Sequence, residues 1–150
     1  MFNIVLVNPE IPQNTGSIGR ICVNTDTKLH IIKPISFDLG EKAVRRAGMD
    51  YWKLLDLVVW ESLDEFLEAN EVHKDRFFFA TTKTDKPYFE ADFQDGDFFF
   101  FGGESCGLPK ELMEQKPQNM VTIPMGKNGR SLNLSVSVGI ILYDAIRQNY

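Results

Sequence analysis

Two runs of phenylalanine constrain the fold of this chain more than any other feature. Phe77–Phe79 and Phe98–Phe101 are short segments in which every position is apolar, so neither side of a strand built from them suits water. Strands that are apolar on both faces are typical of parallel sheets covered by helices on both sides. The two runs therefore predict central strands of such a sheet, over Arg76–Thr81 and Asp97–Phe101.

Strand patterns alternate with helix patterns along the rest of the sequence. The other expected strands are Phe2–Val7, Leu29–Ile32, Leu55–Trp60 and Met120–Ile123. The expected helices are Thr15–Asn24, Glu41–Ala47, Leu63–Asn70, a helical turn over Pro109–Glu114, and Asn133–Gln148. This alternation predicts an α/β fold with a mostly parallel sheet and helices on both faces. No internal repeat or Gly/Ser-rich linker divides the sequence, so residues 1–150 are expected to form a single domain.

The composition excludes several classes of protein. Hydrophobic residues make up 43% and charged residues 25% of the chain, as in ordinary globular domains. No apolar run approaches the ~20 residues that a membrane-spanning helix needs, and no signal-peptide pattern opens the chain. The two cysteines, Cys22 and Cys106, are too few for a disulfide scaffold or a four-ligand zinc site. We therefore expect a cytoplasmic protein that has no metal and no membrane contact.

The net charge of −5 argues at first against a nucleic-acid partner. The distribution of charge weakens that argument. Residues 1–53 carry seven basic and five acidic side chains, a net charge of +2, whereas residues 56–71 carry six acidic groups and no basic one. Because the acidic groups gather in one segment, a basic surface elsewhere on the protein is compatible with the total charge.

The glycine-rich segment Gly102–Pro109 follows a predicted strand, and ligands of parallel α/β sheets bind beyond the carboxyl ends of the strands. It contains G-x-S-x-G, the pattern around the nucleophile of serine hydrolases, but the histidine of that fold follows the serine and both histidines here precede Ser105. The segment also lacks the Lys and Ser/Thr of a phosphate-binding loop. A tight turn explains one or two of its glycines, but not the presence of Glu104 among them.

Two further loops lie at the carboxyl ends of predicted strands. In the first, Asn8–Arg20, prolines stiffen the chain, and Asn14 or Thr15 is expected to cap a helix that carries Arg20 in its second turn. In the second, Ile123–Ser135, a basic glycine-rich loop leads to the last helix, which Ser131 and Asn133 are expected to open. Free N–H groups at a helix start favour an anionic or polar ligand. The alternative for the first loop is a capped loop with one surface arginine, and for the second loop it is simple capping.

Together these three segments resemble the three motifs of the SPOUT superfamily of RNA methyltransferases, in its SpoU branch. The motifs are N-P-x-I-P-x-N-x-G-x-I-x-R over Asn8–Arg20, G-x-E-x-x-G-L-P over Gly102–Pro109, and I-P-M with S-x-N-L-S over Ile123–Ser135. The resemblance is closest to the subfamily that 2′-O-methylates the tRNA wobble nucleotide, and Arg45–Tyr51 is also similar to that subfamily. Val136 departs from the pattern, because relatives often carry Asn after N-L-S.

The resemblance implies a C-terminal trefoil knot that binds S-adenosylmethionine, and a reaction that moves a methyl group to the ribose of cytidine or uridine 34. It implies a cofactor pocket made of Ala80, Thr81, Gly102, Gly103, Leu108, Ile123, Met125, Ser131 and Leu132. Arg20 would be the general base or, since a guanidinium is a poor proton acceptor, a bidentate clamp on the adjacent phosphate. Asn14, Glu104, Ser131 and Asn133 would orient Arg20 and the nucleotide.

The resemblance also implies partners. The substrate would be the anticodon stem-loop of tRNA, with phosphate contacts from Lys42, Arg45, Arg46, Lys127 and Arg130. Relatives are homodimers that pack through the first and last helices. Here Ile140, Ile141, Tyr143 and Ile146 would contribute to that face or else to the core of one subunit. The alternatives are methylation of another tRNA or rRNA position, a non-catalytic RNA-binding module of the same fold, and a small hydrolase.

Overall fold

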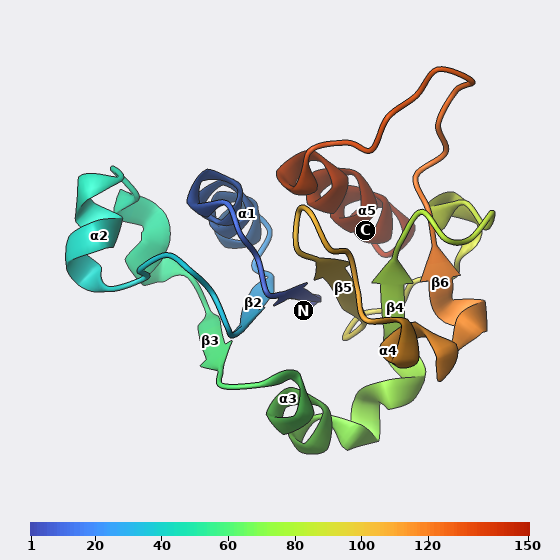
Figure 1. Cartoon of the computed structure of the whole chain (residues 1–150), viewed down its shortest axis with the longest axis horizontal. Helices are drawn as coiled ribbons and strands as arrows, with labels where there is room; N and C mark the ends of the chain where they lie inside the picture. The colour runs from blue at the N-terminus through green and yellow to red at the C-terminus, as the bar shows by residue number, and fades with distance from the viewer.

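The computed structural model describes residues 1–150 and contains one six-stranded sheet (Figure 1). Its strands are β1 (Asn3–Val7), β2 (Lys28–Ile32), β3 (Leu57–Trp60), β4 (Phe77–Ala80), β5 (Phe98–Gly102) and β6 (Met120–Val121). They lie in the order β3-β2-β1-β5-β4-β6, and every neighbouring pair is parallel. The predicted α/β fold with a parallel sheet is confirmed.

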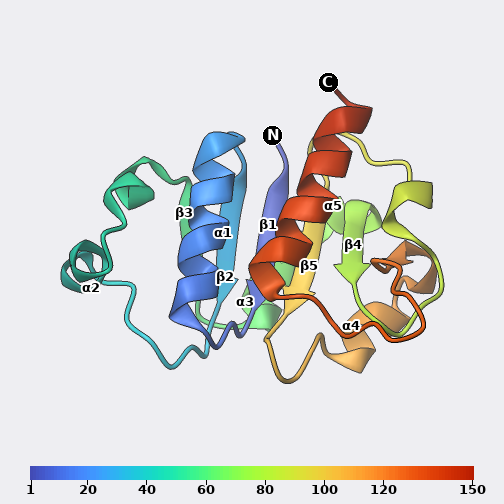
Figure 2. The same cartoon turned by 90° about the horizontal axis from the view of Figure 1, so that it is seen from above.

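Helices cover both faces of the sheet. The helices are α1 (Pro12–Asn24), α2 (Glu41–Arg46), α3 (Leu63–Ala69), α4 (Lys110–Glu114) and α5 (Leu134–Gln148). Helices α1 and α5 lie side by side on one face, α3 and α4 lie on the other, and α2 stands beyond the β3 edge (Figures 1 and 2). None of these helices combines the length and apolarity needed to span a bilayer.

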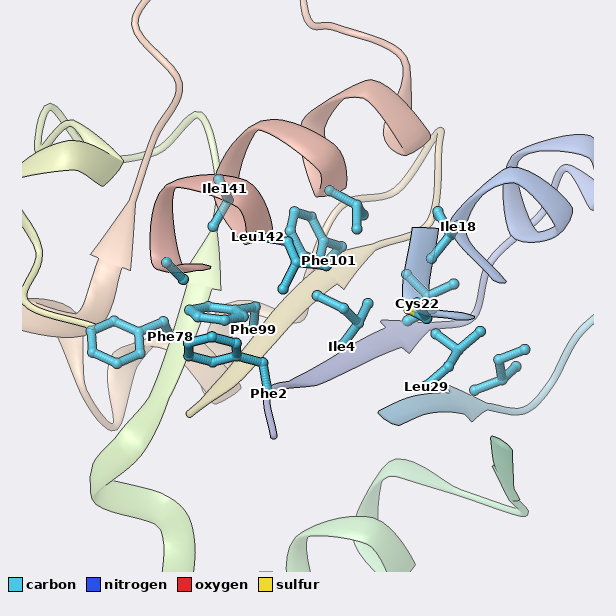
Figure 3. Close-up of a cluster of buried hydrophobic side chains, with 14 of the residues drawn as sticks. Phe2, Ile4, Ile18, Cys22, Leu29, Phe78, Phe99, Phe101, Ile141 and Leu142 are labelled. Carbon is cyan, nitrogen blue, oxygen red and sulfur yellow. The ribbon is translucent and has the colours of Figure 1, made fainter. Parts of the chain in front are cut away.

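The phenylalanine runs occupy the centre of the sheet and alternate between two cores, as predicted. Phe99 and Phe101 of β5 lie with Ile4 in the core under α1 and α5 (Figure 3). Phe98 and Phe100 point the other way, into the core covered by α3 and α4. All four rings are less than 5% exposed, which places β5 among the most completely buried strands of the sheet.

The main differences from expectation lie at element ends and in short irregular turns. Four 3₁₀ helices were not predicted, because a single turn leaves no periodic pattern: η1 (Asp50–Leu54), η2 (Glu71–Arg76), η3 (Tyr88–Glu90) and η4 (Pro117–Asn119). The last strand is shorter than Met120–Ile123 and ends at Val121. These differences leave the order and type of every predicted element unchanged.

The start of α1 corrects one prediction. The helix begins at Pro12, with Ile11 in the capping position, so the expectation that Asn14 or Thr15 caps it is wrong. Proline suits the first turn because its missing N–H would have no helical partner there and its fixed φ is helical. Asn14 and Thr15 instead lie inside the helix and are buried, and this frees the amide of Asn14 for contacts across the site described below.

His30 on β2 is the one buried histidine, and its two hydrogen bonds define its protonation. The indole Nε1–H of Trp60 donates to His30 Nδ1 at 3.1 Å, so the imidazole is neutral and its Nε2–H donates to Asn3 Oδ1 at 3.0 Å. Burial among the rings of Trp60, Phe66 and Phe98 lowers the pKa of His30 to about 4.

We expect this pKa to make the fold sensitive to mild acid. A histidine whose pKa is depressed in the folded state stabilises the fold fully above its unfolded pKa of 6.5, and that contribution is lost as the pH falls toward about 4. The loss amounts to about 3 kcal/mol. Urea unfolding between pH 7.5 and 4.5 measures it. His30→Gln should flatten the dependence between pH 6.5 and 5, whereas His73→Gln, at the exposed histidine, should leave it unchanged; equal slopes in both variants contradict the assignment.

Candidate active site

A pocket of about 600 Å³ lies at the carboxyl ends of β4, β5 and β6. Its size falls in the range of small-molecule sites, and its position is the one that a parallel sheet favours. Every residue expected to form the cofactor pocket lines it: Ala80, Thr81, Gly102, Gly103, Leu108, Ile123, Met125, Ser131 and Leu132. Asn14, Glu104 and Asn133 line it as well. The structure thus gathers segments that lie more than 100 residues apart in the sequence.

The floor of the pocket depends on two glycines. A Cβ atom at Gly102 would overlap the backbone of Gly107 and Leu108, so only glycine allows the loop to fold back on the end of β5. Gly107 closes that loop with φ +69°, a conformation that favours glycine, and its N–H donates to the carbonyl of Gly103. The tight-turn interpretation therefore explains these glycines, and the purpose of the turn is to present Glu104.

Glu104 accepts hydrogen bonds from three donors of the first motif. Its Oε1 accepts from the backbone N–H of Glu10 at 2.8 Å, and its Oε2 accepts from Ile11 N–H at 3.0 Å and from Asn14 Nδ2 at 3.0 Å. The two backbone donors lie directly before α1, where a capping side chain is absent. Glu104 therefore satisfies two backbone N–H groups just before the helix, where no side chain of the helix itself acts as a cap.

Asn14 continues this network to the third motif. Its Oδ1 accepts a hydrogen bond from Asn133 Nδ2 at 2.9 Å. Asn133 is the N-cap of α5, as predicted, and its Oδ1 accepts from the backbone N–H groups of Ser135 and Val136. The Val136 side chain is 48% exposed and only its backbone takes part in the cap, so this departure from the motif leaves the helix start intact.

Ser131 does not open α5, which corrects the prediction for that residue. It lies in the exposed loop two positions before the Asn133 cap and forms part of the pocket wall instead. Pattern alone does not decide between these two candidate capping residues, because Ser and Asn are about equally good caps. The contact with Asn14, which is distant in sequence, selects Asn133.

Glu10 is a site residue that the sequence reasoning missed. Its carboxylate accepts hydrogen bonds from Ser105 N at 2.9 Å and from Ser105 Oγ at 2.8 Å, which lower the pKa of Glu10. Glu104 and Glu10 thus bind each other's loops reciprocally. An acidic residue between two prolines was the available signal. This contact also removes support for the hydrolase alternative, since the Ser105 hydroxyl donates to a carboxylate and His30 is engaged by Trp60 and Asn3.

Arg20 lies outside this network. It is exposed on α1, does not line the pocket, and makes no hydrogen bond to Asn14, Glu104 or Asn133. No hydrogen bond in the single chain joins Arg20 to Asn14, Glu104 or Asn133, which contact one another, so their role in orienting Arg20 stays a prediction. The guanidinium lies over the ring of Tyr51, with 5.9 Å from Cζ to the ring centroid.

The expected phosphate contacts are exposed but do not form one patch on the chain. Arg45 and Arg46 stand on α2, beyond the β3 edge, and Arg45 pairs with Glu41 on the same helix. Lys127 and Arg130 belong to the loop between β6 and α5 at the pocket, on the other side of α1 and α5 (Figures 1 and 2). A long ligand would have to cross the α1–α5 face to reach both pairs.

Comparison with known proteins gives consistent matches over almost the whole chain. The sequence model of the SpoU rRNA Methylase family matches residues 1–143. The tRNA (cytidine(34)-2'-O)-methyltransferase of Methylovorus glucosotrophus is 45% identical over 99% of this chain and 96% of its own length. A structure described as giving insights into the 2-OH methylation of C/U34 on tRNA has a TM-score of 0.90 and 40% identity, covering 99% of this chain and 96% of that one.

A more distant structure shares the fold. The SpoU methyltransferase AviRb from Streptomyces viridochromogenes, in complex with the cofactor AdoMet, has a TM-score of 0.82 with 24% identity. It covers 98% of this chain, and this chain covers 60% of it. At that identity the match supports the architecture described above and nothing finer.

We expect Asn14 to be the residue on which the three-motif network depends. Asn14→Ala removes one partner from Glu104 and one from Asn133, and a lost hydrogen bond in a buried position costs about 1–3 kcal/mol. Urea unfolding should show a decrease of that size. Gln13→Ala, at the exposed neighbouring position of the same helix, is the matched control and should change stability by less than about 0.5 kcal/mol. Similar losses in both variants argue against the network.

Proposed function

This chain belongs to the SpoU rRNA methylase family, and from that membership we propose that it transfers a methyl group from S-adenosylmethionine to the ribose 2′-hydroxyl of cytidine or uridine 34 in tRNA. Relatives named for this reaction match nearly the full length of the chain. The observation that carries the proposal is the hydrogen-bonded chain Glu104–Asn14–Asn133, which joins all three motifs at the mouth of one pocket.

The pocket residues fit S-adenosylmethionine. We assign the apolar side chains Leu108, Ile123, Met125 and Leu132 to exclude water around the cofactor, and loop backbone groups to hydrogen-bond its adenine and ribose. Gly102 supports this fit, because the floor has no room for a side chain that would displace the loop. When bound, the cofactor supplies a methyl group already activated on a sulfonium, so orientation is the main task left to the protein.

The protein must also manage the charge and the proton of the attacking hydroxyl. We propose that Arg20 clamps the phosphate next to the target ribose as a bidentate donor, since a guanidinium keeps its proton. Its exposed position outside the pocket suits contact with RNA better than contact with the cofactor. The general-base role that the resemblance implies is the competing assignment for the same residue.

We propose a homodimer through the outer face of α1 and α5. On α5, Val136 and Tyr143 are large apolar side chains that are 48% and 51% exposed. Ile141 is buried and Ile146 packs against the core under the two helices, so these two belong to the single chain, and Ile140 is half-buried. A Cβ at Gly139 would meet Ile21 Cδ1 at an ordinary 3.7 Å, so packing inside the chain does not require glycine there. A second copy packed closely on α5 would require glycine at this position.

Dimerisation also accounts for the separated basic residues. We propose that Arg45 and Arg46 of one copy and Lys127 and Arg130 of the other contact phosphates of one anticodon stem-loop, because no single copy presents them together. Lys42 is the weaker candidate of the same group.

We also propose that residues 1–150 act as a single domain in the cytoplasm. The C-terminal trefoil knot belongs to this proposal too, supported by the return of the chain from β6 at the sheet edge to α5 beside β5.

Cofactor binding should depend on Gly102 and not on other glycines near the pocket. Isothermal calorimetry of the protein without RNA should detect S-adenosylmethionine, and Gly102→Ala should abolish the signal because its Cβ displaces the loop Gly103–Leu108. Gly126→Ala is the matched control, since nothing lies within 4 Å of its Cβ. Circular dichroism verifies that both variants fold. Binding by Gly102→Ala at wild-type affinity would remove this loop from the cofactor site.

Substitution of Arg20 tests the reaction and separates its two roles. Wild-type protein should place one methyl group on nucleotide 34 of tRNA, detected by mass spectrometry of nuclease fragments. As a phosphate clamp, Arg20→Lys keeps the charge but loses the bidentate fork, so tRNA affinity falls while the pH–rate profile keeps its shape. If Arg20 is the base, Arg20→Lys should lower the single-turnover rate at saturating tRNA by a factor on the order of 10²–10⁴. Near-wild-type turnover for Arg20→Ala would eliminate both roles, and methylation elsewhere would refute the assigned position.

A further inference from the structure

The segment around η1 packs unusually closely on α1. A Cβ at Gly16 would lie 2.8 Å from Met49 Sδ, and a Cβ at Gly19 would overlap the ring of Trp52. These two glycines leave one side of α1 without side chains, so the segment rests directly on the helix backbone. The residues that lead into η1, Arg45–Tyr51, resemble the wobble-nucleotide subfamily, but neither the pocket nor the three-motif network uses them.

Tyr51 is the polar anchor of this packing. Its hydroxyl donates a hydrogen bond to the carbonyl of Gly16 at 2.8 Å. Gly16 and Arg20 are four residues apart, so they lie on the same side of the helix, and the ring of Tyr51 extends along that side. The guanidinium of Arg20 lies over this ring, 5.9 Å from Cζ to the centroid, within the range of a cation–π contact.

Arg20 has no competing side-chain partner. It takes part in none of the ion pairs of the structure and in no side-chain hydrogen bond, although carboxylates engage Arg45, Arg76 and Arg147 elsewhere. An exposed arginine without such a partner samples many rotamers, and ordering it at the moment of reaction costs conformational entropy. The ring of Tyr51 is fixed by its own backbone and by the hydrogen bond of its hydroxyl to Gly16. It is the feature that lies against the Arg20 guanidinium and restricts its rotamers.

We propose that Tyr51 is a positioning residue that holds the Arg20 guanidinium in the orientation used at the RNA. The inference rests on the proposed function. Tyr51 also links Arg20 to α2, the other region proposed to contact RNA. Its element η1 is the next one along the chain after α2, which carries Arg45 and Arg46. Phosphate binding at α2 and placement of Arg20 on α1 are therefore connected through one short segment, Ala47–Tyr51.

A double-mutant cycle tests the proposal through the coupling of the two residues. Tyr51→Leu removes the ring and should lower the single-turnover rate at saturating tRNA by about twofold to fivefold, the factor that a partly exposed cation–π contact supplies. Tyr51→Phe keeps the ring under Arg20 and should lose less. In an Arg20→Ala background, Tyr51→Leu should cause no further loss, because the group that it positions is gone. The affinity for S-adenosylmethionine should stay at the wild-type value in every variant.

A second measurement is independent of activity. The Nε–H signal of Arg20 in a ¹⁵N–¹H spectrum should carry a ring-current shift that disappears in Tyr51→Leu and persists in Tyr51→Phe. Met49→Leu is the matched control, because Met49 packs on Gly16 in the same segment without carrying the ring that faces Arg20; it should keep both the signal and the rate.

Two results would overturn the proposal: an equal loss from Tyr51→Leu with and without Arg20, or an Arg20 signal unaffected by removal of the ring. Either would assign Tyr51 a purely structural role in packing η1 on α1. Failure of wild-type protein to methylate tRNA would instead refute the proposed function, so the two failures are distinguishable.

Discussion

The carboxylate of Glu104 is the interaction on which the rest of the site depends. It lies at the end of the central strand β5, and it binds the start of α1 through two backbone N–H groups and the side chain of Asn14. A charged acceptor with three donors holds its partners more firmly than neutral pairs do. Glu10 reciprocates from the other loop by accepting from Ser105. The two loops that enclose the pocket are therefore fixed to each other, and α5 joins them through Asn133 and Asn14.

The same hydrogen bonds determine the role of the one acidic residue that lines the pocket. Glu104 and Lys83 are the charged residues that line the pocket, and the Glu104 oxygens are already occupied by donors. The carboxylate acts as a structural acceptor rather than as a free charge. The remaining lining is neutral, a mixture of apolar side chains, glycine-rich backbone and uncharged polar side chains such as Thr81, Thr122 and Ser137. Such a surface favours a ligand with a flat ring system and polar edges, which agrees with the adenosine portion of the proposed cofactor.

The sequence predicted the fold well because its strongest signals are local. The phenylalanine runs required burial on both faces, and the alternation of Phe98 to Phe101 between two cores follows from the period of a strand. The predicted pocket residues are found together because they follow strands whose carboxyl ends share one edge. Pattern alone failed where a distant residue decides the outcome. Asn14 resembles a cap by local chemistry, but its amide instead donates to Glu104, ninety residues away. Glu10 and Tyr51 went unassigned for the same reason, since their partners are set by tertiary packing.

Helix α1 is where these constraints meet. Its first turn carries Asn14 into the network, its buried face places Ile18 and Cys22 in the core, and its exposed face carries Arg20. Because the first turn and the buried face are both fixed, the helix has little freedom to rotate or slide. The direction in which Arg20 leaves the helix is therefore determined by the pocket and the core, and what remains is the rotamer of its long side chain. Gly16 and Gly19 allow the segment with Tyr51 to approach closely enough to act on that rotamer. If Arg20 contacts the RNA as proposed, its geometry there depends on Gly16 and Gly19 of α1 as much as on the arginine itself.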